Sequence, residues 1–151
     1  KQIVDFSDVY CTSSVGCVTK ADSDINSFED LQNQIVCCSQ GTNYEMMIED
    51  IPGTTLKTYQ GQAAVGTAVA EATDGVAAGL TSINGAKKLA TTMLDADGNP
   101  MLKYFALEGA RADEYCMAFP KGSELTAIFN EGIQALKDSG KLEELIQYWL
   151  Y

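Results

Sequence analysis

The stretch Ser27-Phe-Glu-Asp-Leu-Gln-Asn-Gln-Ile-Val-Cys-Cys-Ser-Gln-Gly-Thr-Asn-Tyr44 joins a capped helical turn, an apolar strand and a turn that opens another helix. Ser27 and Asp30 have the S-x-x-D spacing of a capping box. Ile35–Cys38 is a short continuous apolar run, which is typical of a strand buried on both faces. Gln40–Thr42 then presents backbone N–H groups at the start of a helix, an arrangement that favours anions and carboxylates.

Beyond this stretch, short apolar runs separated by turn residues predict further strands and helices in alternation. Strands are expected at Val4–Phe6, Gly16–Thr19, Gln34–Ser39, Thr55–Tyr59, Val76–Ala78, Leu102–Ala106 and Glu114–Phe119. Helices are expected at Phe28–Asn33, Asn43–Asp50, Gln62–Thr73 and from Ser82 to Thr91. The alternation predicts an α/β fold with a central, largely parallel sheet flanked by helices.

Two amphipathic helices are predicted in the last quarter of the chain. The first has an apolar face and ends at Gly140; this face comprises Leu125, Ile128, Phe129, Ile133 and Leu136. The second repeats the spacing with Leu142, Leu145, Ile146, Trp149 and Leu150.

Composition and charge exclude several classes of function. The chain has 151 residues, of which 46% are hydrophobic and 21% are charged, as is ordinary for one soluble globular domain. The formal net charge of −11 repels phosphate backbones, so no nucleic-acid partner is expected. The same charge provides no attraction to anionic membranes. The apolar runs are also too short to span a bilayer.

Neither a metal site nor a cofactor site is predicted. The chain has no histidine, and its five cysteines lack a C-x-x-C pair. The segment Asp95–Pro100 superficially resembles a calcium loop, but Gly98 has the wrong offset and no glutamate follows at the twelfth position. The cysteines are interpreted as buried free thiols, and a Cys11–Cys17 disulfide is kept as an alternative.

Three segments, in the right order, resemble one family. Lys1–Tyr10 resembles the segment in which type II periplasmic solute-binding proteins leave their first lobe, and Ser27–Tyr44 resembles the start of their second lobe. Ala118–Leu125 and Gly140–Leu150 resemble their return crossover and closing helices. The resemblance covers nearly the whole chain and is to the branch of polar amino-acid receptors of ABC transporters.

The resemblance implies a domain organisation. Residues 1–10 would be the inter-lobe crossover, residues 11–117 the second lobe, and residues 118–151 the return crossover with the closing helices. In the family, a complete first lobe precedes the crossover segment in the chain. That lobe includes an arginine that binds the ligand's carboxylate. This chain begins at Lys1, after the place of that arginine, so we interpret it as a fragment of a two-lobed receptor.

The resemblance also implies where a ligand would bind. The matching positions in the first binding turn are Ser39, Gln40, Gly41, Thr42 and Asn43. Thr42 would donate its hydroxyl, and Asn43 its amide or backbone N–H, to a carboxylate. The alternative is that Gly41 only turns the chain and that Thr42 caps the helix.

A second binding position is expected after the strand that follows Asp74. Amino-acid receptors usually place an acidic residue there, which pairs with the ligand's ammonium group, but ungapped reading puts Gly79 at this position. Because a buried ammonium needs a partner, another group must neutralise it or the ligand lacks it. Tyr10 and Tyr44 would wall the cleft, or would pack ordinarily at the crossover and in the first helical turn. Arg111 is interpreted as part of a surface ion pair.

The function that the resemblance implies is non-catalytic capture of a small polar solute, an amino acid or a related compound. The chain would be part of the extracellular or periplasmic component of an ABC importer, held by a lipid anchor in the intact parent and docking on permease subunits. Two alternatives stay open: a ligand-sensing domain of a membrane signalling protein, and a cleft enzyme of the dehydratase or lytic transglycosylase type. Because the closing helices normally pack on the first lobe, self-association through them is also expected.

Overall fold

A computed structural model of the chain describes residues 3–150, apart from the side chain of Leu150. The chain divides into two compact units. Residues 14–112 form one of them, called the core unit here. The two chain ends, up to Ser13 and from Asp113 onward, form the other, called the terminal unit.

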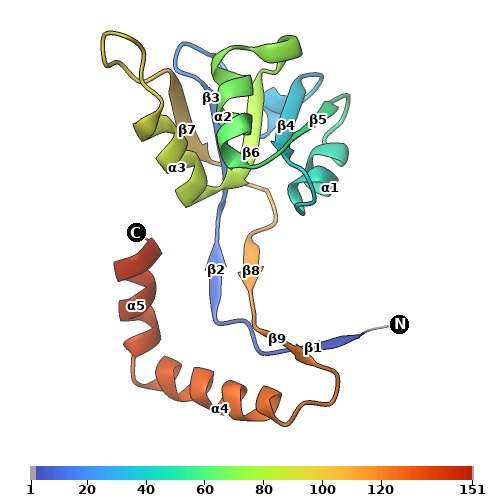
Figure 1. Cartoon of the computed structure of the whole chain (residues 1–151), viewed down its shortest axis with the longest axis vertical. Coiled ribbons are helices and arrows are strands. Elements are labelled where there is room, and N and C mark those ends of the chain that lie inside the picture. The colour runs from blue at the N-terminus through green and yellow to red at the C-terminus, as the bar shows by residue number, and fades with distance from the viewer. Residues whose placement is uncertain (1–2, 151) are drawn as a thin grey trace. The chain divides into compact units, whose positions relative to one another are not determined.

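The core unit is built on a five-stranded sheet with the order β5-β4-β6-β3-β7 (Figure 1). The strands are β3 (Val15–Lys20), β4 (Ile35–Ser39), β5 (Thr55–Tyr59), β6 (Ala78–Ser82) and β7 (Leu102–Ala106). β5, β4 and β6 run parallel to one another, whereas β3 is antiparallel to both of its neighbours. The α/β class expected from the sequence is confirmed, with a sheet of mixed direction.

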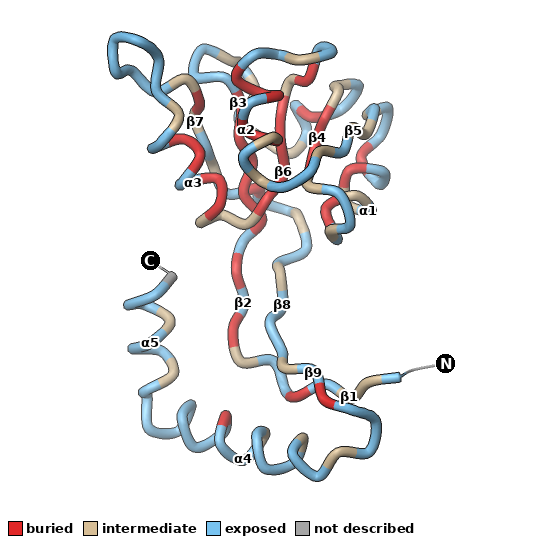
Figure 2. The backbone as a smooth tube through the Cα atoms, in the orientation of Figure 1, coloured by how far each residue is buried: buried red, intermediate tan, exposed pale blue. Residues whose placement is uncertain are grey.

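Helices cover both faces of this sheet, and two clusters of buried residues lie beneath them (Figure 2). α1 (Tyr44–Glu49) and the 3₁₀ turn Glu29–Leu31 pack on one face. α2 (Gln62–Ala70) and α3 (Ile83–Thr92) pack on the other. Cys37 and Cys38 are neighbours on β4, so they point to opposite faces, and each belongs to a different cluster.

This connectivity creates a switch point between β4 and β6. From β4 the chain crosses through α1 to β5 on one side, and from β5 it returns through α2 to β6 on the other side of β4. The two crossovers lie on opposite faces of the sheet. Open α/β sheets bind ligands at such a switch point, beside the carboxyl ends of the strands. A site is therefore expected at this edge of the core unit.

The boundary between α2 and β6 was predicted wrongly, and the strand β2 (Cys11–Ser13) was not predicted. The helix expected to reach Thr73 ends at Ala70, because Ala72 takes a left-handed conformation with φ 50°. A short 3₁₀ turn, Thr73–Gly75, follows. The strand expected at Val76–Ala78 therefore begins later and forms β6.

The terminal unit contains two short antiparallel ladders. β1 (Val4–Phe6) pairs with β9 (Ala118–Pro120), and β2 (Cys11–Ser13) pairs with β8 (Asp113–Tyr115). The strand predicted at 114–119 is thus divided in two. Between the ladders, the Ser7 backbone N–H donates to the Met117 carbonyl over 2.8 Å, so the chain ends stay paired.

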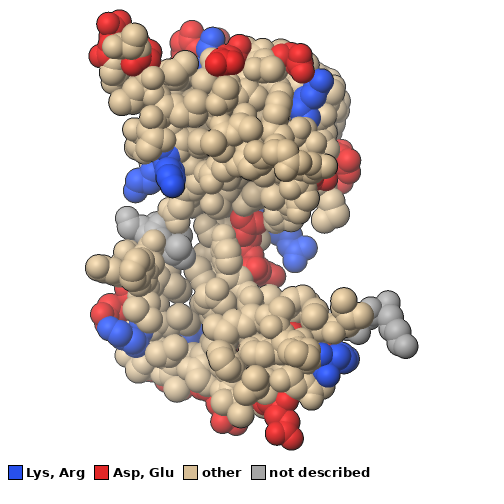
Figure 3. Space-filling model, viewed as in Figure 1, with Lys and Arg blue, Asp and Glu red and all other residues tan. Residues whose placement is uncertain are grey.

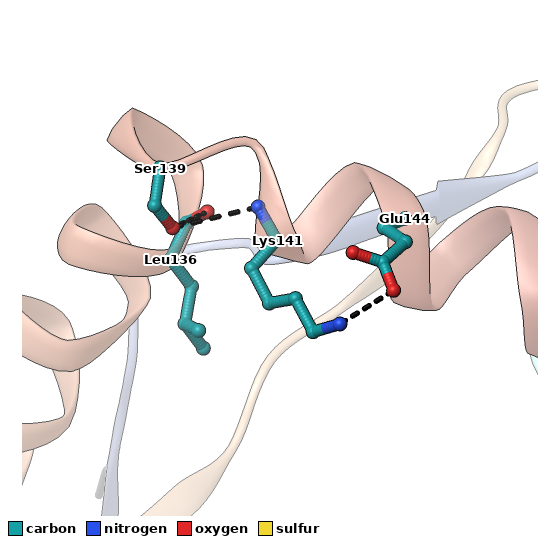
Figure 4. Close-up of polar contacts among 4 residues, drawn as sticks. All are labelled: Leu136, Ser139, Lys141 and Glu144. Carbon is teal, nitrogen blue, oxygen red and sulfur yellow. Dashed lines mark hydrogen bonds and ion pairs between the residues drawn. The ribbon is translucent and has the colours of Figure 1, made fainter.

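The two predicted amphipathic helices are present as α4 (Leu125–Asp138) and α5 (Lys141–Leu150). At their junction the Ser139 hydroxyl donates to the Leu136 carbonyl, and Lys141 forms an ion pair with Glu144 (Figure 4). On the apolar face of α4 only Ile133 is buried. Within residues 3–150, no helix has the length and apolar character that crossing a membrane requires.

Candidate functional site

The turn that closes β4 holds the first group of site residues together. Gly41 has φ 79°, a conformation that side chains of L-residues disfavour. Its backbone N–H donates a 2.6 Å hydrogen bond to Oε1 of Glu45, in the first turn of α1. A carboxylate of the protein itself thus accepts one backbone donor of this turn.

Thr42 stabilises the turn from within. Its hydroxyl donates to the Ser39 carbonyl over 2.7 Å. The N-cap position of α1, which the sequence alternative gave to Thr42, is held by Asn43. Burial raises the pKa of the Cys38 thiol, and a hydrogen bond with Thr42 partly opposes that shift.

Gln40 connects this turn to the loop that leads into α2. Its backbone N–H donates to the Tyr59 carbonyl over 2.9 Å, and its side-chain oxygen accepts a hydrogen bond from the Gln60 amide. The carboxyl ends of β4 and β5 therefore present one continuous polar edge, which runs from Ser39 to the start of α2.

Gly79 was expected at the carboxyl end of its strand, but it does not lie there. It is the second residue of β6, because the strand begins two residues later than predicted. Gly79 is also buried. A Cβ added there would lie 2.7 Å from Cγ1 of Val65 and 3.1 Å from Cγ2 of Val18. The missing side chain makes room for α2, so the structure gives Gly79 a packing role.

The polar residues at the carboxyl end of β6 are Thr81 and Ser82. Cys38 pairs with Leu80, so Ser39 and Thr81 are the next residues on the two parallel strands. Ser82 accepts the backbone N–H of Gly85 over 3.2 Å and caps α3, as predicted. Thr81 is buried and faces the start of α2 and α3.

Sequence reasoning missed Gln62, the first residue of α2. Its side-chain Nε2 is buried and has no hydrogen-bond partner among residues 3–150. A Cβ on Gly85 would lie 2.4 Å from that nitrogen and 2.8 Å from Oγ1 of Thr81, so both polar groups converge over this glycine. Nothing in the local sequence signals this, since the return crossover brings the residues together.

The two candidate aromatic residues lie in different environments. Tyr44 is buried in the core beside Cys38 and Ile48, which confirms its packing interpretation. Tyr10 belongs to the terminal unit, where it lines a pocket of about 490 Å³ together with Lys137 and Glu143.

The cysteines are all free thiols. Each of the five, all within the described residues, is unpaired, and only Cys116 is exposed. The expected free thiols are thus present, the alternative Cys11–Cys17 disulfide is not formed, and the expectation of burial was wrong for Cys116. Burial raises the pKa of Cys17 and of Cys37 to about 12. No group of three or more potential metal ligands occurs in the described part of the chain.

Charge is spread over the surface. On the face shown in Figure 3, acidic side chains stand at several separate places. Asp5, Asp30 and Asp95 have a pKa below the usual value because neighbouring groups donate hydrogen bonds to their carboxylates. Arg111 is exposed, in the segment that follows β7.

Comparison with known proteins agrees with this architecture. The family model of bacterial extracellular solute-binding proteins, family 3, matches residues 1–151. The chain is 32% identical to the arginine-binding extracellular protein ArtP of Bacillus subtilis, over 99% of this chain and 57% of ArtP. It therefore spans little more than half the length of this curated relative.

Two solved structures have the same fold. One is the amino-acid ABC transporter substrate-binding protein AbpA of Streptococcus pneumoniae bound to L-arginine, with 27% identity and a TM-score of 0.75, covering 96% of this chain and 60% of AbpA. The other is the arginine-, lysine-, histidine-binding protein ArtJ of Geobacillus stearothermophilus, with 24% identity and a TM-score of 0.77 over 99% of this chain and 63% of ArtJ.

Proposed function

The chain belongs to the bacterial extracellular solute-binding proteins, family 3, and from this premise we propose that it forms one ligand-binding lobe of an amino-acid receptor. The lobe binds the ligand at the carboxyl ends of β4 and β6. The role is non-catalytic, and a closing movement against a second lobe would complete the grip.

The observation that carries this proposal is the hydrogen bond from the Gly41 N–H to the Glu45 carboxylate. This bond supports the proposal that the backbone N–H groups of the turn bind a carboxylate, a group that every amino acid has. We assign Ser39, Gln40, Gly41, Thr42 and Asn43 to that contact. Gly79 shapes the sheet beneath the site. The binding role of Tyr10, which belongs to the terminal unit, stays a prediction. The names of ArtP and AbpA support an amino acid as the ligand.

The acid–base properties favour binding over catalysis. A cleft enzyme needs a carboxyl group with a raised pKa to act as a general acid. Among the described aspartates and glutamates, the pKa values that depart from the usual range are all lowered. Turnover of a prephenate-type or peptidoglycan substrate by the purified chain would contradict this part of the proposal.

Family membership indicates where the chain acts and which partners to propose. As a member of an extracellular family the chain acts outside the cytoplasm. We further propose a lipid anchor on the intact parent and docking on the permease subunits of an ABC importer. No nucleic-acid partner is proposed, since the net charge is −11.

Self-association of the chain is proposed through α4 and α5. Ile128 is 60% exposed and Trp149 is 74% exposed, which leaves large apolar side chains in water. Light scattering after size exclusion should show a dimer or larger species that Ile128→Glu disrupts. Ala127→Glu, an exposed neighbour off the apolar face, is the control. A strict monomer at high concentration contradicts the proposal.

The binding proposal is tested with the ¹⁵N-labelled chain and a panel of amino acids. Addition of ligand up to tens of millimolar should shift the amide signals of Gly41 and Thr42, because a single lobe binds weakly, with Kd on the order of millimolar. Thr42→Val should weaken binding roughly two- to tenfold through the lost hydroxyl. Thr58→Val, an exposed β5 position, should not. A folded chain whose turn signals respond to no amino acid would refute the proposal.

A further inference from the structure

The apolar face of α4 contains an open pocket, called the α4 pocket here. It has a volume of about 350 Å³ and is lined by Met117, Ile128, Phe129, Gly132, Ile133 and Leu136. Gly132 is exposed, and a Cβ added there would meet no atom within 4 Å, so the helix leaves free space at this point. Pockets of roughly 300 Å³ and more with apolar walls are large enough to hold an apolar or aromatic group.

Two exposed aromatic residues near the end of α5 are the matching feature. Tyr148 is 76% exposed and Trp149 is 74% exposed. Their rings contact each other edge to face, with the centroids 5.0 Å apart. Aromatic side chains can bury about 150–250 Å² each and dominate the energetics of interfaces, so this pair favours an apolar contact that removes it from water.

The α4 pocket and the aromatic pair belong to the same groove of the terminal unit. A second pocket, of about 450 Å³, is lined by Trp149 and also by Met117, which lines the α4 pocket as well. The two helices are largely exposed in Figure 2. A surface that carries both an exposed aromatic group and an open pocket can complement itself, because a twofold axis places each group opposite the pocket of the other copy.

The exposed apolar area is also large enough for a stable pair of copies. Beside the aromatic pair, the two helices leave five large apolar residues between 37% and 60% exposed: Leu125, Ile128, Phe129, Leu136 and Leu145. Together with the aromatic pair, these side chains present on the order of 700 Å². A standard specific interface buries roughly 800 Å² per partner, so this surface is of the size that a dimer needs.

Resting on the self-association proposed above, we propose that the partner is a second copy of this chain and that Trp149 of each copy packs into the α4 pocket of the other. The contact is isologous, so it closes with two copies and gives a dimer. Trp149 is the anchor of the interface, since tryptophan side chains in apolar pockets carry much of the binding energy.

The fluorescence of Trp149 reports this contact directly, because the chain has no other tryptophan. An interface of this size gives a Kd on the order of micromolar or tighter. On dilution through that range, the emission should move to longer wavelength as Trp149 leaves the pocket, and light scattering should show the dimer dissociating over the same concentrations. Salt at about 0.3 M screens the repulsion between two copies that each carry a net charge of −11.

A substitution at Gly132 tests the pocket. Gly132→Leu fills the free space with a residue that favours helix formation, so it should weaken dimerisation at least about tenfold and keep the emission of Trp149 at the longer wavelength. Ala127→Leu adds a leucine to an exposed position of α4 off the apolar face, and it should keep the wild-type Kd. Circular dichroism should show that both variants are folded.

The outcomes distinguish this inference from self-association in general. If the chain dimerises while the emission of Trp149 stays the same at all concentrations, or if Gly132→Leu dimerises as the wild type does, the packing of Trp149 into the α4 pocket is overturned and self-association stands. A strict monomer at every concentration overturns both. Amino-acid binding by the core unit is measured separately, from the amide signals of Gly41 and Thr42.

Discussion

The backbone N–H of Gly41 and the carboxylate of Glu45 are joined by a 2.6 Å hydrogen bond across the turn that links β4 to α1. The bond depends on the left-handed conformation of Gly41, with φ 79°, which directs its N–H toward the first turn of the helix. The turn therefore needs a residue that tolerates a φ of 79°, which glycine does.

Replacing Gly41 with alanine should destabilise the chain by about 1–2 kcal/mol, the cost of a left-handed conformation for an L-residue. A Cβ there has no atom within 4 Å, so backbone strain is the only expected cause. Gly132→Ala is the control, because that glycine lies in α4 with equally open surroundings and should be neutral or stabilising by up to about 1 kcal/mol. Urea unfolding followed by circular dichroism measures both. Equal effects of the two substitutions would contradict the strain argument.

Gly79→Ala should destabilise the core unit by about 1–3 kcal/mol through overpacking against α2. The new Cβ would lie 2.7 Å from Cγ1 of Val65, so Val65→Ala should partly relieve the clash. In a double-mutant cycle of unfolding free energies, the double variant should lose less stability than the two single changes added together. Strict additivity would show that Gly79 is not packed against Val65.

The capping box of Ser27 and Asp30 should make stability depend on pH. The Asp30 carboxylate accepts the Asn26 and Ser27 backbone N–H groups over 2.9 and 3.0 Å, and these bonds lower the pKa of Asp30 below 3.8. A lowered native pKa contributes stability that is fully present above 3.8 and is lost as the pH falls through the native value.

The wild-type chain should therefore exceed Asp30→Asn in unfolding free energy at pH 6, and the difference should shrink toward pH 3. Asp24→Asn serves as the control, because it removes a nearby exposed charge. If the Asp24 variant shows the same pH-dependent difference, net charge and not the capping box is responsible. Urea unfolding at each pH provides the free energies.

Cysteine labelling should follow burial. Cys116 is exposed and should react with iodoacetamide first at pH 8. Burial raises the pKa of Cys17 and Cys37 to about 12, so these thiols remain protonated and covered in the folded chain. Mass spectrometry of the labelled peptides gives the order, and labelling in urea should modify all five. Early modification of Cys17 in the folded chain would contradict its position in the core.

Local patterns in the sequence predicted many of the elements. The S-x-x-D spacing predicted the capping box, and the reciprocal bonds between Ser27 and Asp30 confirm it. Ser82 was correctly predicted to cap α3. The start of β6 was missed, because the apolar run Val76–Ala78 does not reveal that the backbone turns at Ala72 and Asp74. Such left-handed positions outside glycine carry no reliable sequence signal.

The sequence by itself determined the elements whose signals are local: the buried strand Ile35–Ser39, the Gly41 turn, and the two amphipathic helices at the end of the chain. Apolar periodicity and turn chemistry depend on residues that are close together in the chain, so the sequence alone reveals them. Only the tertiary structure decided which polar residues come together at the carboxyl end of β6. Gln62 and Thr81 meet over Gly85 because the crossover through α2 returns the chain to the far side of β4, a pairing that depends on sheet order.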